Sequence, residues 1–369
     1  MSNIVRHIHL VGTPTAKLWG LEVLEWQARA YKKFGLSLSQ NGQDVSHFLD
    51  AHFVLSNNLL KAFAQSDNVA LIVDGHIIGV SGGHKDMLGR PASAAEDLRT
   101  ARPDQLVSSY DKALRKTEAP YALDVRTTSP DVIMKQQFAG SYKGITDFVT
   151  KFFWPVPAFY ATRFCANLRI TPNMVTTLSL VMTVAAFYFF LQGQWALGFV
   201  TGWFMTFLDT VDGKLARTTM TFSKWGNVYD HGIDLIHPPF WYWAWFVGLG
   251  GVFVWPNITT DLMAFALVAI LVGYVVDRIV EGIFIAQHGF HIHVWRPINS
   301  ALRFIIARRN PNTFIFMIAI MLMGIWPEAG RWGFYTVAIW TWVCIAFNVA
   351  VVCVGFLRRG KIQSWMDSK

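Results

Sequence analysis

The sequence predicts a membrane all-α domain with six transmembrane helices, preceded by a soluble cytoplasmic α/β domain. Charged residues make up 15% of the 369 residues and hydrophobic residues 53%, whereas about 25% of an ordinary soluble domain is charged. The deficit is local, because residues 1–135 mix charged, polar and apolar residues and long apolar runs begin near Trp154. We therefore expect a soluble domain over residues 1–138, a linker with an interfacial helix over 139–172, and a membrane domain over 173–369.

The N-terminal part alternates strand-like and helix-like patterns, as α/β domains do. A strand is expected to end near Gly12, a helix to run from Leu18 to Phe34, and a later strand to cover Val69–Val73 before a turn at Asp74. Residues 1–10 lack the apolar core of a signal peptide. The domain is therefore expected to stay in the cytoplasm.

Six apolar runs come close to the length of about 20 residues that a helix needs to cross a bilayer. They cover residues 174–192, 195–211, 231–254, 261–286, 313–327 and 332–357. Lysine and arginine crowd the gaps on one side of these runs, whereas the gaps on the other side hold Arg331 alone. Because cytoplasmic loops carry the excess of basic residues, we expect a multi-pass protein of the inner membrane with both termini in the cytoplasm. The stretch Lys151–Arg163 is aromatic, basic and too short to span, which predicts a helix lying on the inner leaflet.

The net charge of +8 lies largely beside these apolar runs. This placement indicates anionic lipid headgroups as the partner and argues against nucleic acid. The three cysteines, Cys165, Cys344 and Cys353, form no CxxC pair and are interpreted as packing residues.

Acidic and small residues recur at helical spacing after the second run. They form two sets: Asp209, Asp212, Gly213 and Ala216, then Gly226, Asp230 and Asp234. Residues spaced by three, four and seven positions share one helix face, and so do residues that step by four. The residues between the two sets can turn back, so two antiparallel helices would present four carboxylates to one pocket at the cytoplasmic surface.

Four carboxylates this close to a bilayer need compensation, since one charge at the bilayer centre costs about 2.5–3.5 kcal/mol. Lys214 and Arg217 are too few and lie on other faces of the helix. Helix capping would explain one or two aspartates, but not four with two glycines in register. Carboxylate oxygens suit Mg²⁺ or Mn²⁺, which share their coordination shell with substrate phosphates. Glycine at position 213 destabilises a helix by about 1 kcal/mol relative to alanine, so something should need the space that a side chain would fill. A nucleotide lying flat against the helix would need that space.

The stretch from Asp209 to Asp234 fits the pattern D-x2-D-G-x2-A-R-x8-G-x3-D-x3-D at every fixed position and so resembles the CDP-alcohol phosphatidyltransferase family. The layout of six runs is also similar to that family, and so is the segment 171–173 with Thr176, over about residues 140–357. The resemblance implies transfer of a substituted phosphate from a CDP-alcohol, with CDP-diacylglycerol as the favoured donor, to an acceptor alcohol. CMP would be released, in phospholipid biosynthesis.

The resemblance also implies roles for single residues. Two Mg²⁺ or Mn²⁺ ions would be bound by Asp209, Asp212, Asp230 and Asp234. CDP would be bound by Asp209, Asp212, Gly213, Ala216, Arg217, Gly226, Asn173 and Thr176. Asp234 would be the general base, although the residues alone leave open which aspartate takes the proton. Two metal ions stabilise the attacking and leaving oxygens together.

Arginines near the inner ends of the later runs are candidates for binding an acceptor or donor phosphate. They are Arg278, Arg303 and Arg308. A guanidinium fork suits phosphate, but the same charges also fit the positive-inside pattern alone. The histidines of this region, His288, His291 and His293, are interpreted as solvated near lipid headgroups.

Some members of the family carry an N-terminal domain that resembles sugar-phosphate nucleotidyltransferases, and residues 1–138 resemble a degenerate one. Only the segment 12–17 remains of a glycine-rich phosphate loop. We therefore expect this domain to scaffold the enzyme or to assist a homodimer. The fusion raises inositol phosphate as an acceptor, by analogy alone.

Two other functions remain open. A membrane prenyltransferase also binds diphosphate through aspartates and Mg²⁺, but its motifs lie on well-separated helices, whereas here they are consecutive. A transporter or lipid-binding protein predicts polar residues at mid-membrane and broken helices. The charges of this chain instead crowd one interface.

Overall fold

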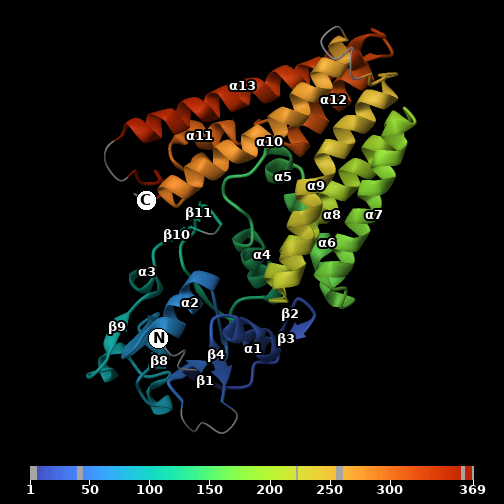
Figure 1. Ribbon diagram of the computed structural model, residues 1–369. Helices are drawn as coiled ribbons and strands as arrows, with labels where there is room; N and C mark the ends of the chain where they lie inside the picture. Colours follow the sequence, from blue (N-terminus) through green and yellow to red (C-terminus); the bar gives the residue numbers. More distant parts are fainter. Residues whose placement is uncertain are drawn as a thin grey trace.

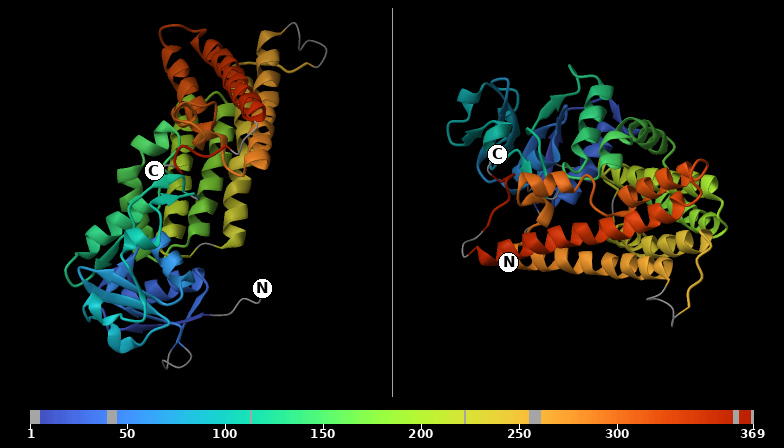
Figure 2. Two further views of the ribbon diagram at one scale, coloured as in Figure 1. Left: turned by 90° about the vertical axis from the view of Figure 1, so that its left-hand side faces the viewer. Right: turned by 90° about the horizontal axis from the view of Figure 1, so that it is seen from above.

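The computed structural model describes residues 6–39, 45–112, 114–221, 223–254, 261–358 and 362–367. An α/β region lies at one end of a bundle of long helices (Figure 1), and the views in Figure 2 show the same division from the side and from above. The prediction of a mostly helical chain with an N-terminal α/β domain is confirmed.

The N-terminal region is built on a six-stranded sheet in the order β4-β1-β5-β8-β7-β9. Its strands are β1 (Arg6–Val11), β4 (Leu36–Leu38), β5 (His47–Asp50), β7 (Val69–Val73), β8 (His76–Ser81) and β9 (Arg99–Ala101). β1 pairs in parallel with β4 and β5, and β8 runs antiparallel to both of its neighbours. Smaller two-stranded pairs are β2 (Lys17–Leu18) with β3 (Leu21–Glu22), β6 (Phe53–Leu55) with β12 (Ala122–Asp124), and β10 (Tyr110–Asp111) with β11 (Lys116–Thr117).

Short helices pack around this sheet. They are α1 (Val23–Lys33), α2 (Asn57–Gln65), α3 (Pro103–Leu106), η1 (Lys85–Met87) and η2 (Ala92–Ala94). The buried residues of α1 include Val23, Trp26 and Ala30. They recur every three or four positions, so one face of the helix joins the core.

The predicted strands ending near Gly12 and over Val69–Val73 are confirmed, and Asp74 turns the chain with a φ of 49°. The helix predicted from Leu18 is wrong over its first residues, because the chain forms the β2–β3 hairpin there and α1 begins at Val23. Trp19 and Gly20, with φ of 53° and 72°, occupy the hairpin turn. Positive φ at both central residues matches the twist that a two-residue hairpin needs.

Three helices connect the two parts of the chain: α4 (Pro130–Gly140), α5 (Phe148–Phe152) and α6 (Pro155–Asn167). The helix predicted over Lys151–Arg163 is divided between α5 and α6, since Pro155 opens α6 at a first-turn position, where proline is tolerated. Val156, Tyr160 and Phe164 are exposed at steps of four and form an apolar stripe along α6.

Six long helices correspond to the six apolar runs. They are α7 (Pro172–Leu191), α8 (Trp195–Thr218), α9 (Lys224–Gly248), α10 (Leu262–His288), α12 (Arg309–Leu322) and α13 (Ala329–Leu357). The short elements η4 (Ile292–Val294) and α11 (Pro297–Leu302) lie between α10 and α12. By length and composition, α7, α10 and α13 are able to cross a membrane. The chain is thus a membrane protein with three such helices in its described part.

Two of the apolar clusters among the described residues bear on the position of the site. One lies inside the bundle, where the rings of Trp245 and Phe316 stack with centroids 4.3 Å apart. The other is shared, because the cluster that contains Trp26 of α1 also contains Val211 and Leu215 of α8. The N-terminal region and the end of α8 therefore bury one continuous apolar surface.

Candidate metal and substrate site

Three carboxylates meet where α8 ends and α9 begins. Asp209 and Asp212 lie on α8 and Asp230 lies on α9, and one oxygen of each lies within 4.8 Å of the others. α9 starts directly after the turn because the Ser223 hydroxyl accepts the backbone N–H of Gly226 at 2.9 Å. α7 packs against both helices (Figure 1), which fixes their common end.

Asp212 is the most buried of the three, with 3% of its surface exposed. Its Oδ2 accepts the hydroxyl of Thr176 at 2.5 Å, whereas its Oδ1 is buried without a hydrogen-bond partner among the described residues. A buried carboxylate oxygen without a partner is unfavourable unless a cation binds it. Three carboxylates with one such oxygen therefore fit a hard divalent cation.

Asp234, the fourth predicted carboxylate, is joined to this group through Arg309 of α12. The Arg309 guanidinium donates from Nη1 to Asp234 Oδ1 at 2.5 Å and from Nη2 to Asp209 Oδ2 at 2.8 Å. The structure thus brings three of the four aspartates within reach of one metal ion. The fourth, Asp234, lies beside them and is ion-paired with the Arg309 guanidinium. The side chain of Asp234 is 42% exposed and faces an open space.

The two glycines of the motif lie against its polar side chains. A Cβ on Gly213 would lie 2.9 Å from Nη2 of Arg217, and a Cβ on Gly226 would lie 2.7 Å from Oδ1 of Asn173. The Arg217 guanidinium therefore occupies the space next to Gly213 that a side chain at this position would need. Arg217 Nε is buried without a hydrogen-bond partner among the described residues.

The remaining residues expected to bind CDP lie close by. Thr176 contacts Asp212 as described. Ala216 is half-buried on α8, and its carbonyl accepts the backbone N–H of Thr221 at 3.1 Å, which tightens the turn toward α9. The residues expected to bind CDP thus come from the adjacent ends of α7, α8 and α9.

A cavity of 290 Å³ opens beside Asp234 and is strongly basic. The three predicted arginines, Arg278, Arg303 and Arg308, all line it, and so do Lys143 and Arg309. Arg308 is ion-paired with Glu281, and Arg278 lies 3.8 Å from the same carboxylate. Arg303 differs, since both its Nε and its Nη1 are buried without hydrogen-bond partners among the described residues, whereas Arg278 and Arg308 each leave only Nε without one.

Lys143 adds a titratable charge to this cavity. Burial, together with the nearby guanidinium groups of Arg115, Arg217 and Arg303, lowers the pKa of Lys143 to about 8. Its ammonium group is therefore present at neutral pH and is lost in mildly alkaline solution.

Two site residues escaped the sequence analysis. Arg309 stands next to Arg308 in a basic loop, and the sequence does not show which of the two faces the aspartates. Lys143 lies in a linker without a recognisable motif. The expectation that His293 is solvated is wrong, because His293 is 3% exposed and its Nε2 lies 2.8 Å from Glu281 Oε1.

Long apolar helices with a carboxylate cluster at one end define a membrane protein with an acidic cation site. A family model described as CDP-alcohol phosphatidyltransferase matches residues 169–354, half of the chain, and the chain belongs to this family. The archaetidylinositol phosphate synthase of Pyrococcus horikoshii is 37% identical over 91 residues, which cover 24% of this chain and 47% of that protein. The chain therefore matches about half the length of this curated relative.

Solved structures of Mycobacterium tuberculosis phosphatidylinositol phosphate synthase show a distant similarity. The form with CDP-DAG bound is 18% identical with a TM-score of 0.42, covering 56% of this chain and 98% of that chain. The complex with manganese and citrate is 17% identical with a TM-score of 0.41, covering 55% and 93%.

Proposed function

We propose that the chain transfers a substituted phosphate from a CDP-alcohol, with CDP-diacylglycerol as donor, to an acceptor alcohol that itself carries a phosphate. CMP is the second product. Membership of the family supports the reaction class. The name of the curated relative, an archaetidylinositol phosphate synthase, supports an inositol phosphate as acceptor. The observation that carries the proposal is the carboxylate cluster beside an arginine-lined cavity.

Asp209, Asp212 and Asp230 hold the divalent cations, with Asp234 contributing to a second ion. Bound Mg²⁺ or Mn²⁺ would neutralise the donor diphosphate and stabilise the leaving oxygen of CMP. Thr176 orients Asp212 by its hydrogen bond, and Arg217 lies where it can reach the nucleotide phosphates. Gly213, Ala216, Gly226 and Asn173 form the adjoining surface for the nucleotide.

Asp234 is the proposed general base. It borders the basic cavity, so an acceptor hydroxyl bound there can pass its proton to this carboxylate. The ion pair with Arg309 fixes the orientation of Asp234 before the transfer.

The acceptor phosphate is bound chiefly by Arg303 and Lys143. Arg303 offers two buried N–H groups that no described residue accepts, and a phosphate oxygen satisfies such groups with charge-assisted hydrogen bonds. Arg278 and Arg308 are already engaged with Glu281 and shape the wall. An uncharged acceptor would offer the Arg303 groups only the weaker hydrogen bonds of a hydroxyl oxygen, which favours a phosphorylated one.

In the membrane, we propose that all six long helices span the bilayer with both termini in the cytoplasm of an inner-membrane homodimer. α10 supports lipid contact, since Val272, Val275, Ile279 and Ile283 are exposed along one side. α6 would lie on the inner leaflet with Val156, Tyr160 and Phe164 toward the acyl chains.

The N-terminal region is proposed to act as a scaffold without nucleotidyltransferase activity. The loop after β1 is closed by side chains, because a Cβ on Gly12 would lie 2.7 Å from Cε1 of His52. His52 is hydrogen-bonded to Asp50 at 2.8 Å, and Arg126 pairs with Asp124 at 2.7 Å. These contacts leave little of a phosphate-binding loop.

The reaction is tested with the purified full chain in detergent. CMP release is measured with CDP-diacylglycerol and three acceptors, namely inositol 1-phosphate, inositol and glycerol 3-phosphate, with Mg²⁺, with Mn²⁺ and after chelation by EDTA. We expect CMP release with inositol 1-phosphate that requires the metal. Absence of CMP with every CDP-alcohol and acceptor tried would refute the proposal.

A further inference from the structure

The N-terminal region holds the end of α8 by a buried side chain. Trp26 of α1 is 1% exposed, and its indole Nε1–H donates to the backbone carbonyl of Thr218 at 2.7 Å. Thr218 is the last residue of α8, so its carbonyl has no partner inside the helix. The hydrogen bond joins residues that lie 192 positions apart in the sequence.

A second contact lies one turn earlier on the same helix. Lys214 is 4% exposed and its Nζ donates to the backbone carbonyl of Ser141 at 3.2 Å. Lys214 Nζ also lies 3.4 Å from the centroid of the Tyr142 ring. Residues 214 and 218 are four apart and share a helix face, so both contacts act on one side of α8.

That side faces away from the carboxylates. Lys214 and Thr218 follow Asp209 by five and nine positions, which rotates them by about 140° and about 180° around the helix axis. Val211 and Leu215 pack into the core that contains Trp26. The last turns of α8 are therefore fixed from behind, with the carboxylates on the free side.

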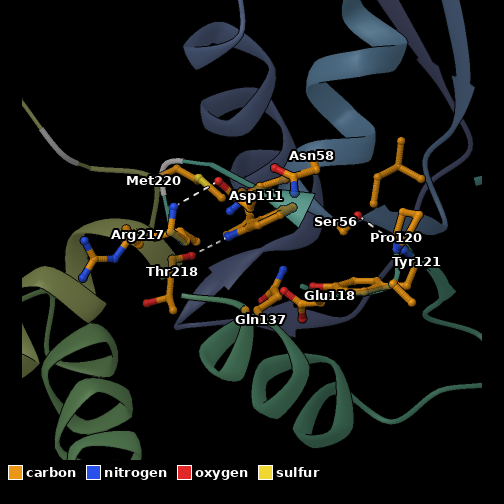
Figure 3. A pocket seen from close by; sticks show the side chains of 16 residues that line it. Ser56, Asn58, Asp111, Glu118, Pro120, Tyr121, Gln137, Arg217, Thr218 and Met220 are labelled. Atoms are coloured by element: carbon orange, nitrogen blue, oxygen red, sulfur yellow. Dashed lines mark hydrogen bonds between the residues drawn. The ribbon is translucent and has the colours of Figure 1, made fainter. Parts of the chain in front are cut away.

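The interface is packed and leaves little room for a substrate. Figure 3 shows Arg217 and Thr218 on one side of its pocket and Glu118 and Tyr121 on the other. The volume of this pocket is 30 Å³, enough for one or two waters but not for a nucleotide.

We propose that Trp26 and Lys214 are positioning residues for the metal centre. Through them, the N-terminal region and the adjoining segment 139–172 set the rotation and axial position of α8, and with these the distance from Asp209 and Asp212 to Asp230 on α9. The inference rests on the metal site of the proposed function. It assigns the N-terminal region a defined task in that function, which is to raise the affinity for the divalent cation.

The test compares two variants that each lose one indole hydrogen bond. Trp26→Phe removes the donor to Thr218 and keeps an apolar ring. Trp19→Phe is the matched control, since Trp19 is 1% exposed in the same apolar cluster but donates its indole N–H at 2.7 Å to Gln137 of α4 rather than to α8. Mn²⁺ binding to the purified full chain is titrated by electron paramagnetic resonance of the free ion, and the melting temperature is recorded. We expect the Mn²⁺ affinity to fall about 3- to 10-fold in Trp26→Phe, which is less than the loss for a residue hydrogen-bonded directly to a metal ligand. In Trp19→Phe the Mn²⁺ affinity should change less than about twofold.

Lys214→Met separates positioning from charge. If Lys214 acted only through a positive charge, removing that charge would tighten Mn²⁺ binding. Positioning predicts weaker binding in this variant, as in Trp26→Phe. Equal Mn²⁺ affinities for Trp26→Phe and Trp19→Phe, or tighter binding in Lys214→Met, would overturn the inference. The titration needs no substrate, so absence of CMP release would defeat the proposed reaction without deciding this point.

Discussion

The guanidinium of Arg309 lies 2.5 Å from the carboxylate of Asp234 on α9 and also contacts the carboxylate of Asp209 on α8. One side chain of α12 thus links a proposed metal ligand to the proposed base. Lysine carries the same charge but not the planar fork. Arg309→Lys is therefore expected to lower kcat about 10- to 100-fold through misplacement of Asp234.

Steady-state kinetics of CMP release check this expectation. Arg331→Lys is the control, because Arg331 pairs with Glu328 on the surface before α13 and should tolerate the exchange. Wild-type kcat in Arg309→Lys would show that the bridge has no catalytic importance.

Asp212→Asn is expected to weaken Mn²⁺ binding at least about 10-fold and to abolish CMP release, because the buried oxygen without a partner is the strongest candidate for a ligand. The measurement is the Mn²⁺ titration of the purified protein. Asp261→Asn is the matched exchange, since Asp261 caps α10 and asparagine caps equally well. Unchanged Mn²⁺ affinity in Asp212→Asn would remove this residue from the site.

Gly213→Ala separates helix stability from substrate binding. Alanine gains about 1 kcal/mol of helix propensity, while its Cβ forces the flexible end of Arg217 to move. We expect an unchanged or higher melting temperature together with a lower kcat/KM for the CDP-alcohol. Gly282→Ala on α10 has open space around it and should raise stability without affecting kcat/KM. A Gly213→Ala enzyme with full kcat/KM would contradict the role of Arg217.

Arg303→Met should raise KM for the phosphorylated acceptor about 10-fold or more, since a charge-assisted hydrogen bond contributes about 1.5–3 kcal/mol. KM for the CDP-alcohol should change little. Arg296→Met is a suitable comparison, because Arg296 belongs to the same loop but lies over the ring of Trp295 at 4.2 Å. Equal effects of both variants on acceptor KM would point to general charge rather than a phosphate contact.

Acceptor binding should depend on pH through Lys143. Its pKa is lowered to about 8, so the ammonium is present below pH 8 and is lost above it. KM for inositol 1-phosphate is therefore expected to rise by up to about 10-fold between pH 7 and pH 9, whereas KM for unphosphorylated inositol stays flat. Lys143→Arg keeps its charge and should remove the rise. A rise that persists in this variant would assign the titration to another group.

The sequence predicted the part of the site that depends on local spacing. Asp209 and Asp212 share a face because helical periodicity requires it, and Asp230 joins them after one short turn. The contacts of Arg309 with Asp234 and of Trp26 with Thr218 join residues 75 and 192 positions apart. Such pairs depend on how whole helices pack, which periodicity does not determine. The error at Leu18 had a local cause, a hairpin turn at Trp19 and Gly20 that a helical pattern conceals.

The apolar cluster shared by Trp26, Val211 and Leu215 has a consequence for how the molecule can be divided. A fragment that begins after residue 138 would expose one flank of α8 to water and lose the side chains that cover it. The two halves should therefore melt in a single cooperative transition, and expressing either half alone should yield aggregates. We therefore expect the boundary visible in the composition to separate two environments, water and bilayer, rather than two independently folding units.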